Sequence, residues 1–392
     1  MKSPLRMARR AALIAAVAMA CGGATNAQAA QLFGFNDNSF AGLQNVANPA
    51  DTAAQLEHGM GAQVQRLSVQ WWRIEPSDST GCNRTTGSWT LYDNTMQALA
   101  AHGVKPVLVI MDAPKWAWGN VGCGAGGSTC PYAESKCHVP PGDHFLGAWQ
   151  SIVTQIADRY HGQLAGIEVW NEPNNVGWWQ AVGGPDPAEY EKAFAYAAAG
   201  VHSVNATYGT HIPVLTAGLV YEDATTNSTY TIPDFLSGFY AAGGASAMQP
   251  GDAVGAHVYP TPADITSGCL VPSPAQSCNT SGFNLTLGQY KSTVGQYDSG
   301  RPLWITETGI TTTPATSPTE QQQASGLDGI IKEVSPMTAV GALLIHTAIE
   351  PNANASKPAE QGYGVYHQTL QPKPAACTIA LDEGQPKPAG CP

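Results

Sequence analysis

Basic side chains are scarce in this sequence. It has 18 Lys and Arg residues against 29 Asp and Glu residues, and charged residues make up only 12% of the 392-residue chain. Surfaces that bind nucleic acid neutralise phosphates with clustered Lys and Arg side chains. An acidic chain with so few basic residues argues against nucleic acid as a partner and fits a neutral substrate.

Long apolar runs are also missing, except near the start. Residues 1–10 carry four basic side chains, residues 11–20 are almost wholly apolar, and Ala27-Gln28-Ala29 follows. This order is typical of a secretory signal peptide, and its apolar run is too short to span a bilayer. We therefore expect residues 1–29 to be removed and the remainder to be a secreted monomer without a membrane segment. A lipoprotein signal through Cys21 fits less well, because the three residues before it make a poor lipobox.

The common zinc-binding patterns Cys-x-x-Cys and His-Glu-x-x-His do not occur, so no metal or other cofactor is expected. After residue 29 the cysteines are Cys82, Cys123, Cys130, Cys137, Cys269, Cys278, Cys377 and Cys391. An even number in a secreted chain favours disulfides. Spacing favours Cys269–Cys278 and Cys377–Cys391 as local pairs. The other four would pair among themselves, with at least one bridge from Cys82 to the loop over residues 111–142.

Strand-like and helix-like segments alternate along the chain. The strand-like runs cover residues 32–35, 63–70, 105–110, 166–174, 213–217, 252–259, 302–309 and 340–346. Eight strands alternating with helices predict an α/β protein with one (β/α)8 TIM barrel over residues 30–376. A doubly wound sheet is the competing architecture, but no glycine-rich phosphate loop follows the first strand. Residues 377–392 are expected to be a Pro-rich tail tied by a disulfide.

Two of the strand-like runs end in a glutamate. The run GIEVWNEPN contains Glu172, and PLWITETG contains Glu307. Pro173 should stop the first of these strands, and side-chain alternation predicts Glu172 on the same side as Trp170 and Glu168. Carboxylates at the C-terminal ends of parallel strands lie where α/β barrels build active sites. The pair therefore predicts a hydrolase that works with two carboxyl groups.

Three motifs in strand order resemble the retaining glycoside hydrolases of clan A, most closely their families 39 and 5. These motifs are Trp170-Asn171-Glu172-Pro173, His257-Val258-Tyr259 and Thr306-Glu307-Thr308-Gly309. The resemblance covers nearly all of the chain after the signal peptide. It implies cleavage of β-linked O-glycosidic bonds in oligo- or polysaccharides by double displacement. Glu172 would then be the general acid/base and Glu307 the nucleophile.

The same resemblance implies roles for four more residues. Asn171 would hold the sugar 2-hydroxyl, Tyr259 would hydrogen-bond the nucleophile, Arg66 would orient it, and His257 would line the site. Aromatic rings in loops on the catalytic face of a barrel commonly stack on sugars. Among six tryptophans after the second, third and fourth strands, we expect Trp71, Trp116 and Trp178 to bind substrate and the others to pack.

The sequence departs from the clan at two positions and leaves alternatives open. Many members end strand eight with a tryptophan, where this chain has Ile345-His346-Thr347, and many carry a histidine after strand three, where it has Asp112-Ala113-Pro114. The sequence therefore does not identify the sugar of the substrate. Arg66 could pair only with Glu168, and His257 and Tyr259 could be core residues. As a whole, the chain could be a catalytically inactive carbohydrate-binding barrel, or a metal-dependent hydrolase, for which no ligand cluster is evident.

Overall fold

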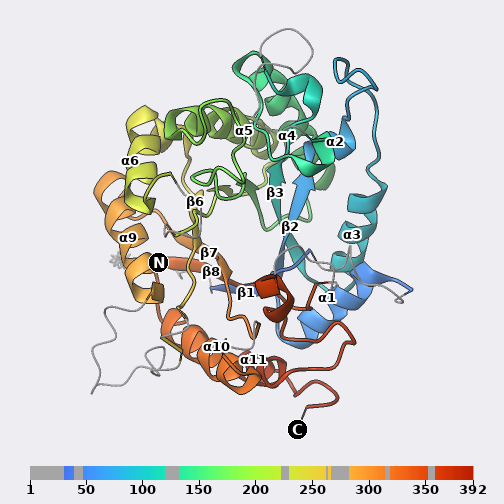
Figure 1. Ribbon diagram of the computed structural model, residues 1–392, viewed down its shortest axis with the longest axis vertical. Coiled ribbons are helices and arrows are strands. Elements are labelled where there is room, and N and C mark those ends of the chain that lie inside the picture. The colour runs from blue at the N-terminus through green and yellow to red at the C-terminus, as the bar shows by residue number, and fades with distance from the viewer. Residues whose placement is uncertain are drawn as a thin grey trace, which may run out of the picture.

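The computed structural model describes residues 31–38, 47–119, 132–221, 229–261, 264–265, 282–313, 318–351 and 358–391. Eight parallel strands pair in chain order and close into a barrel. The strands occupy the middle of the molecule, and the helices surround them (Figure 1). The predicted single (β/α)8 barrel is confirmed.

The strands are β1 (Leu32–Asn36), β2 (Val64–Gln70), β3 (Lys105–Met111), β4 (Gly166–Val169), β5 (Val214–Thr216), β6 (Ala253–His257), β7 (Leu303–Thr308) and β8 (Val340–Ile345). The α-helices are α1 (Pro49–Gly59), α2 (Trp71–Ile74), α3 (Thr90–Ala101), α4 (Leu146–Tyr160), α5 (Pro187–Tyr208), α6 (Ile232–Ala242), α7 (Gly244–Ala247), α9 (Gly282–Tyr297), α10 (Glu320–Val334) and α11 (Pro374–Asp382). Short 3-10 turns are η2 (Lys115–Ala117), η3 (Glu134–Lys136), η4 (Asp143–Phe145) and η5 (Pro358–Gly362).

Several helices begin where their sequence supplies an N-cap. The side chain of Asp186 accepts hydrogen bonds from the first turn of α5, and Pro187 stands at the first helical position. Thr319 and Gln322 form a reciprocal capping box at the start of α10. These local signals set where α5 and α10 start.

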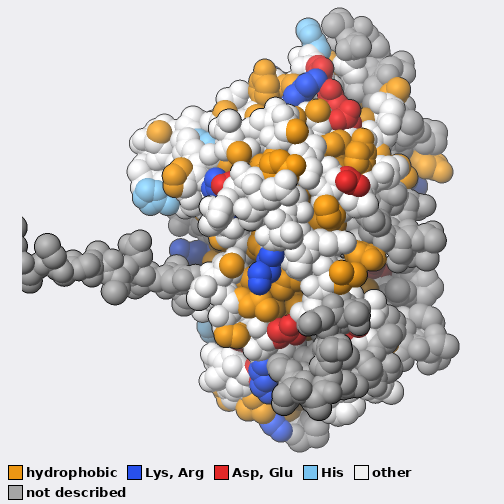
Figure 2. Space-filling view, turned by 90° about the vertical axis from the view of Figure 1, so that its left-hand side faces the viewer, with side chains coloured by type: hydrophobic (Ala, Val, Ile, Leu, Met, Phe, Trp, Pro, Cys, Tyr) orange, Lys and Arg blue, Asp and Glu red, His pale blue; other side chains and the backbone are white. Residues whose placement is uncertain are grey.

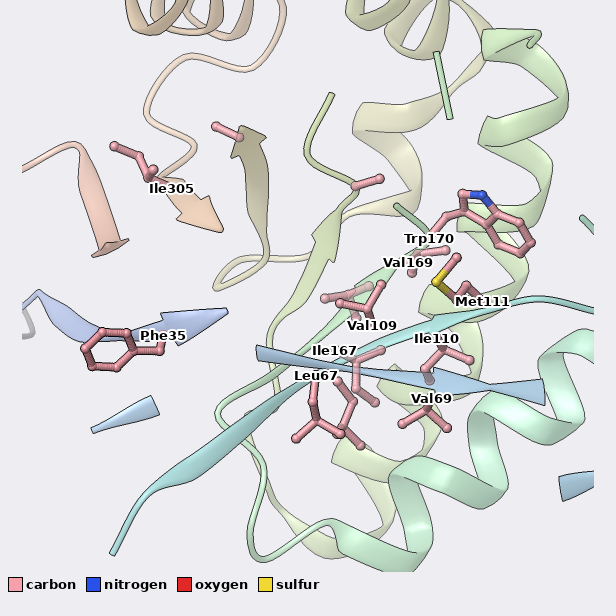
Figure 3. Packing of buried hydrophobic residues seen from close by; sticks show 14 of the residues in the cluster. Phe35, Leu67, Val69, Val109, Ile110, Met111, Ile167, Val169, Trp170 and Ile305 are labelled. Atoms are coloured by element: carbon pink, nitrogen blue, oxygen red, sulfur yellow. The ribbon is translucent and has the colours of Figure 1, made fainter. Parts of the chain in front are cut away.

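The core has two apolar parts. The larger part lies between the strands and the helices, where Leu67, Val69 and Ile110 from β2 and β3 pack together (Figure 3). A smaller cluster comes mostly from the N-terminal halves of the strands and consists of Val64, Val107, Leu215, Ala253, Trp304, Ala342 and Leu344. Nearer the C-terminal ends of the strands the buried residues include Arg66, Glu168 and His257. One end of the barrel is thus apolar, and the other carries buried charge.

The first residues of the expected Pro-rich tail belong to a helix. Helix α11 begins with Pro374, buries several alanines and packs against α10, so the predicted boundary between residues 376 and 377 falls inside it. The expected disulfide between Cys377 and Cys391 is present, with an S–S distance of 2.04 Å. Cys82 and Cys137 are also disulfide-bonded. The remaining pairing expectations involve residues 123, 130, 269 and 278, which lie outside the described residues, as does the expected signal peptide.

The described surface mixes charges of both signs. On the side of α6 and α9, Lys and Arg side chains stand singly among acidic, polar and hydrophobic ones (Figure 2). Within the described ranges, no helix is both long and apolar enough to cross a membrane.

Candidate active site

The two glutamates lie at the C-terminal ends of β4 and β7, but β4 is shorter than predicted. It ends at Val169, and the backbone of Trp170 and of Glu172 takes positive φ angles of 74° and 44°. Such angles are uncommon for residues other than glycine and often mark functional sites. Simple strand alternation therefore stops before Trp170. It cannot be the reason that Glu172 points into the site.

The prediction that the side chains of Trp170 and Glu168 lie on the same side of the strand is wrong. Its ring packs in the outer core against Trp149 of α4 and Trp179, and its indole N–H donates to the carbonyl of Trp178 at 2.6 Å. Figure 3 shows the ring among the buried apolar side chains near the helices. Glu168 instead lies inside the barrel, where Arg66 contacts it. The two side chains diverge because the backbone leaves the extended conformation between them.

A register shift sets the position of Glu307. Strands β6 and β7 pair Ala256 with Ile305 and then His257 with Glu307, so one residue of β7 is passed over. Irregularities of this kind bend a strand and re-aim its side chains, often beside active sites. Here the shift brings His257 and Glu307 level on neighbouring strands.

Glu172 and Glu307 are close together and reachable from solvent. One carboxylate oxygen of each and a ring nitrogen of His257 all lie within 4.8 Å of one another. Their side chains are 14% and 13% exposed, whereas His257 is buried. Retaining glycosidases hold their carboxyl groups about 5–5.5 Å apart, and inverting enzymes hold them about 6.5–9.5 Å apart. The spacing here suits direct attack by one carboxylate.

Three positively charged or donor groups surround Glu307. Arg66 Nη1 donates to its Oε1 at 2.5 Å, the Tyr259 hydroxyl donates to its Oε2 at 3.0 Å, and His257 Nε2 lies 3.6 Å away. Burial raises the pKa of Glu307, but the charges of His257, Arg66 and His346 and the Tyr259 hydrogen bond together lower it to about 2. Glu307 is therefore ionised at any ordinary pH.

Arg66 pairs with both Glu168 and Glu307, which the sequence offered as alternative partners. Its Nε and Nη2 donate to the two carboxylate oxygens of Glu168 at 2.6 and 3.1 Å, while Nη1 reaches Glu307. Nη2 also donates to Asn171 Oδ1 at 3.0 Å. The buried guanidinium is thus fixed by a fork-like contact on one side. It presents its remaining donors to Asn171 and Glu307.

His257 lies between the two glutamates. Its Nε2 lies 3.5 Å from Arg66 Nη2, on the side of Glu307. Its Nδ1 lies 2.9 Å from Glu172 Oε1 and donates to it, because a carboxylate oxygen accepts. Gly218 makes room for the ring, since a Cβ there would lie only 2.0 Å from its Cδ2 atom. The requirement for glycine at this position is not evident in the sequence.

The three tryptophans expected at the substrate site lie in different surroundings. Trp71 is fully buried, packs on Trp116 and Trp149, and donates its N–H to Glu75, so it has no face for a sugar. Trp116 is 9% exposed and donates to the carbonyl of Glu75. The expected substrate contact does not fit Trp71, because the short helix α2 turns the ring into the core.

Trp178 is the partly exposed member of the three. Its ring lies 4.2 Å from the ring of His138, whose Nδ1 is 2.9 Å from the buried carboxylate of Asp112. Asp112 directly follows β3 and also accepts from Gln70. His138 therefore lies near the end of β3, where many clan members carry their histidine. Sequence reasoning missed it because it comes from far along the loop.

A second group of side chains, only partly indicated by the sequence, follows β8. The ring of His346 lies 5.1 Å from that of Tyr363, and Tyr363 packs edge-on against Tyr259. His346 also contacts Asn36 and Glu360, each at 3.1 Å. The altered strand-eight motif identified His346 in the sequence. Glu360 lies in the short turn η5 and Tyr363 directly follows it, and neither belongs to a recognisable sequence pattern.

Comparison with known proteins identifies the fold. No family model and no curated protein matches the sequence. Among solved structures, a family 39 glycoside hydrolase from Bacteroides cellulosilyticus WH2 has a TM-score of 0.56 at 16% identity, over 85% of this chain and 60% of that one. A GH39 β-xylosidase from Caulobacter crescentus gives 0.58 at 16%, over 90% and 70%.

A GH5_18 protein from Streptomyces cattleya, in complex with GlcNAc, gives a TM-score of 0.58 at 14% identity, over 92% of this chain and 82% of that one. The chain is thus similar in fold to clan A glycoside hydrolases of families 39 and 5, as its motifs predict. It spans 60% of the length of the Bacteroides enzyme.

Proposed function

We propose that this protein is a secreted, retaining glycosidase that hydrolyses β-linked O-glycosidic bonds with Glu172 and Glu307. The observation that carries the proposal is the pair itself. Two carboxylates whose oxygens lie within 4.8 Å have different partners, a guanidinium and a phenol for Glu307 and a histidine for Glu172. Different surroundings are what separate the nucleophile from the acid in such enzymes.

In the first step, a carboxylate oxygen of Glu307 attacks the anomeric carbon. The bond from that carbon to the leaving oxygen breaks, and protonated Glu172 gives its proton to this oxygen. In the second step, ionised Glu172 takes a proton from water, the water oxygen attacks the anomeric carbon, and the ester bond to Glu307 breaks. Each step inverts the anomeric centre, so the product retains the β configuration.

The neighbouring side chains support this sequence of steps. Arg66 directs Asn171 Oδ1 toward itself, which leaves the amide nitrogen of Asn171 to donate to a sugar 2-hydroxyl. Tyr259 and Arg66 stabilise the charge of Glu307 between turnovers. Trp178 offers a ring for stacking, and His138, held by Asp112, offers a polar edge.

The acidic composition favours a neutral oligo- or polysaccharide as substrate, acted on outside the cell by a monomer. The steps above need no cofactor. The metal-dependent alternative would use Glu172, His257 and Glu307 as ligands. It is disfavoured by Arg66, since a guanidinium 2.5 Å from Glu307 would repel a cation there.

A panel of aryl β-glycosides and polysaccharides, followed by proton NMR of the first-formed product, tests the proposal. We expect turnover that chelators do not affect, and the β anomer should appear before mutarotation. Appearance of the α anomer first would exclude double displacement. Binding of a sugar without any turnover would favour the inactive carbohydrate-binding barrel.

A further inference from the structure

His346, which directly follows β8, is tied into the site without touching the nucleophile. Its Nδ1 lies 3.1 Å from Nδ2 of the buried Asn36 at the end of β1, and its Nε2 lies 3.1 Å from Oε2 of Glu360. The side chains of His346 and Glu360 are 22% and 41% exposed. The pair therefore joins a solvent-exposed acid to a buried amide.

Asn36 continues this connection to the nucleophile. Its Oδ1 accepts from Arg66 Nη1 at 3.0 Å, and the same nitrogen donates to Glu307 Oε1 at 2.5 Å. Hydrogen bonds thus run without a break from Glu360 through His346, Asn36 and Arg66 to Glu307. Each group from Asn36 onward is at most slightly exposed.

The direction of every bond in this chain is fixed by Arg66. A guanidinium has only donors, so the oxygen of the Asn36 amide must face it and the amide nitrogen must face His346. His346 Nδ1 can then only accept. The ring proton of His346 then lies on Nε2, which donates a hydrogen bond to Glu360.

We propose that His346 and Glu360 are positioning residues that, through Asn36, hold Arg66 in the orientation in which it pairs with Glu307. This rests on the proposed role of Glu307 as nucleophile. Nη1 donates to both Asn36 and Glu307. If the side-chain amide of Asn36 rotated by half a turn, its N–H groups would face Arg66 and displace the guanidinium. Small displacements around reacting groups reduce the rate strongly.

The charges around His346 make this arrangement sensitive to pH. Burial lowers its pKa, but the Glu360 hydrogen bond and the charges of Glu307 and Asp37 raise it above the ordinary value. Tyr363, the other titratable group against the ring, remains neutral because burial raises its pKa. Protonation puts a hydrogen on Nδ1, facing the Asn36 N–H groups. The positioning chain therefore works only while His346 is neutral.

Two substitutions separate the two contacts of His346. His346→Asn keeps an acceptor near the Nδ1 position for Asn36, and His346→Gln keeps a donor near the Nε2 position for Glu360. With an aryl glycoside, we expect His346→Gln to lose kcat about ten- to a hundredfold with little change in KM, and His346→Asn to stay within a few-fold of wild type. The acid limb of kcat/KM should move to lower pH in His346→Asn, because the titrating group is gone.

NMR of the full chain tests the positioning without turnover. With carboxyl-labelled Glu, at a pH where His346 is neutral, the Glu307 signal is identified by its loss in Glu307→Gln. This signal should shift in His346→Gln but not in His346→Asn, because Arg66 is displaced from Glu307 only in the Gln variant. Ring ¹⁵N shifts should report the Nε2-protonated tautomer of His346 in the wild type.

His367→Gln is the matched control, because this histidine follows β8 too but pairs with Glu320 and Glu350. It should change neither kcat nor the Glu307 signal. An unaltered Glu307 signal in His346→Gln, or equal kinetics of the Asn and Gln variants, would overturn the positioning role. If the wild type turned over no glycoside, the proposed function would fail, while the NMR signal would still decide whether His346 acts on Glu307.

Discussion

Glu172 and Glu307 differ in what happens when each is removed. Glu307→Ala should abolish turnover of every substrate, because no glycosyl ester can form. Glu172→Ala should lose about 10²–10⁴-fold with a natural leaving group but far less with a dinitrophenol, which leaves without a proton. Steady-state kinetics on matched activated and natural substrates check this. Equal losses for both variants on both substrates would contradict the assigned roles.

Arg66 cannot be replaced by lysine without loss, although the charge is kept. Arg66 contacts Glu168, Asn36, Asn171 and Glu307, and one ammonium cannot reach all four. We expect Arg66→Lys to lower kcat about a hundredfold and to destabilise the fold by about 3–5 kcal/mol, since Glu168 remains buried.

Kinetics and urea unfolding measure the two effects. Arg159→Lys is the control, because Arg159 pairs with Asp93 on the outer surface. An Arg66→Lys variant as active and as stable as this control would show that the contacts inside the barrel have no functional weight.

Strand ends explain how much of the site can be predicted from the sequence. Arg66, His257 and Glu307 belong to strands whose apolar runs are easily recognised, and the barrel brings these strands together. Loop residues carry no such periodicity, so the approach of His138 to Asp112 could not be predicted. The burial of Trp71 depends on a short helix directly after β2, which the tryptophan content of the segment does not indicate.

Among the helices and strands, α11 is stabilised by a disulfide bond. The bond between Cys377 and Cys391 closes a segment of 14 residues around the end of the helix. Closing a loop of this size is worth about 3 kcal/mol. Replacing both cysteines by serine should lower the free energy of unfolding by this amount, as measured in urea without reductant. An unchanged midpoint would mean that the packing of α11 on α10 suffices.

Element boundaries were predictable only where local chemistry sets them. Helix α10 starts at a capping box, in which the side chain of Thr319 accepts from the backbone of Gln322. Strand β4 ends earlier than predicted because the backbone turns at Trp170, and the shift between β6 and β7 arises from pairing between distant segments. The alternation of strands and helices predicts a barrel, but it carries no information on such local departures from regular pairing.

At the scale of the whole molecule, stability should depend on pH through buried acids outside the site. Glu57 on α1 is fully buried, and burial and the neighbouring Asp37 charge raise its pKa well above the ordinary value. Burial likewise raises the pKa of Asp382 to about 6 and that of Glu383 to about 7, both at the end of α11. The folded protein therefore binds protons that the unfolded chain has released.

The direction in which the free energy of unfolding changes with pH follows from the linkage between folding and proton binding. A carboxyl group whose pKa is higher in the folded state favours folding below its unfolded pKa of about 4.3, and this contribution is lost as the pH rises through the folded pKa. The lowered pKa of Glu307 acts in the opposite direction, at still lower pH. We therefore expect the free energy of unfolding to fall between about pH 5 and pH 8.

Glu57→Gln should reduce this fall, because the amide can donate to Asp37 as the protonated acid does, while its oxygen still accepts from Gln65. Urea unfolding at several pH values, compared with the wild type, measures the difference. Glu189→Gln is the control, since that carboxyl lies exposed beside Lys192 on α5. If Glu57→Gln kept the full pH dependence of the wild type, Glu57 would have to be ionised inside the fold. The energetic cost of its burial would then have to be offset by contacts other than the one with Gln65.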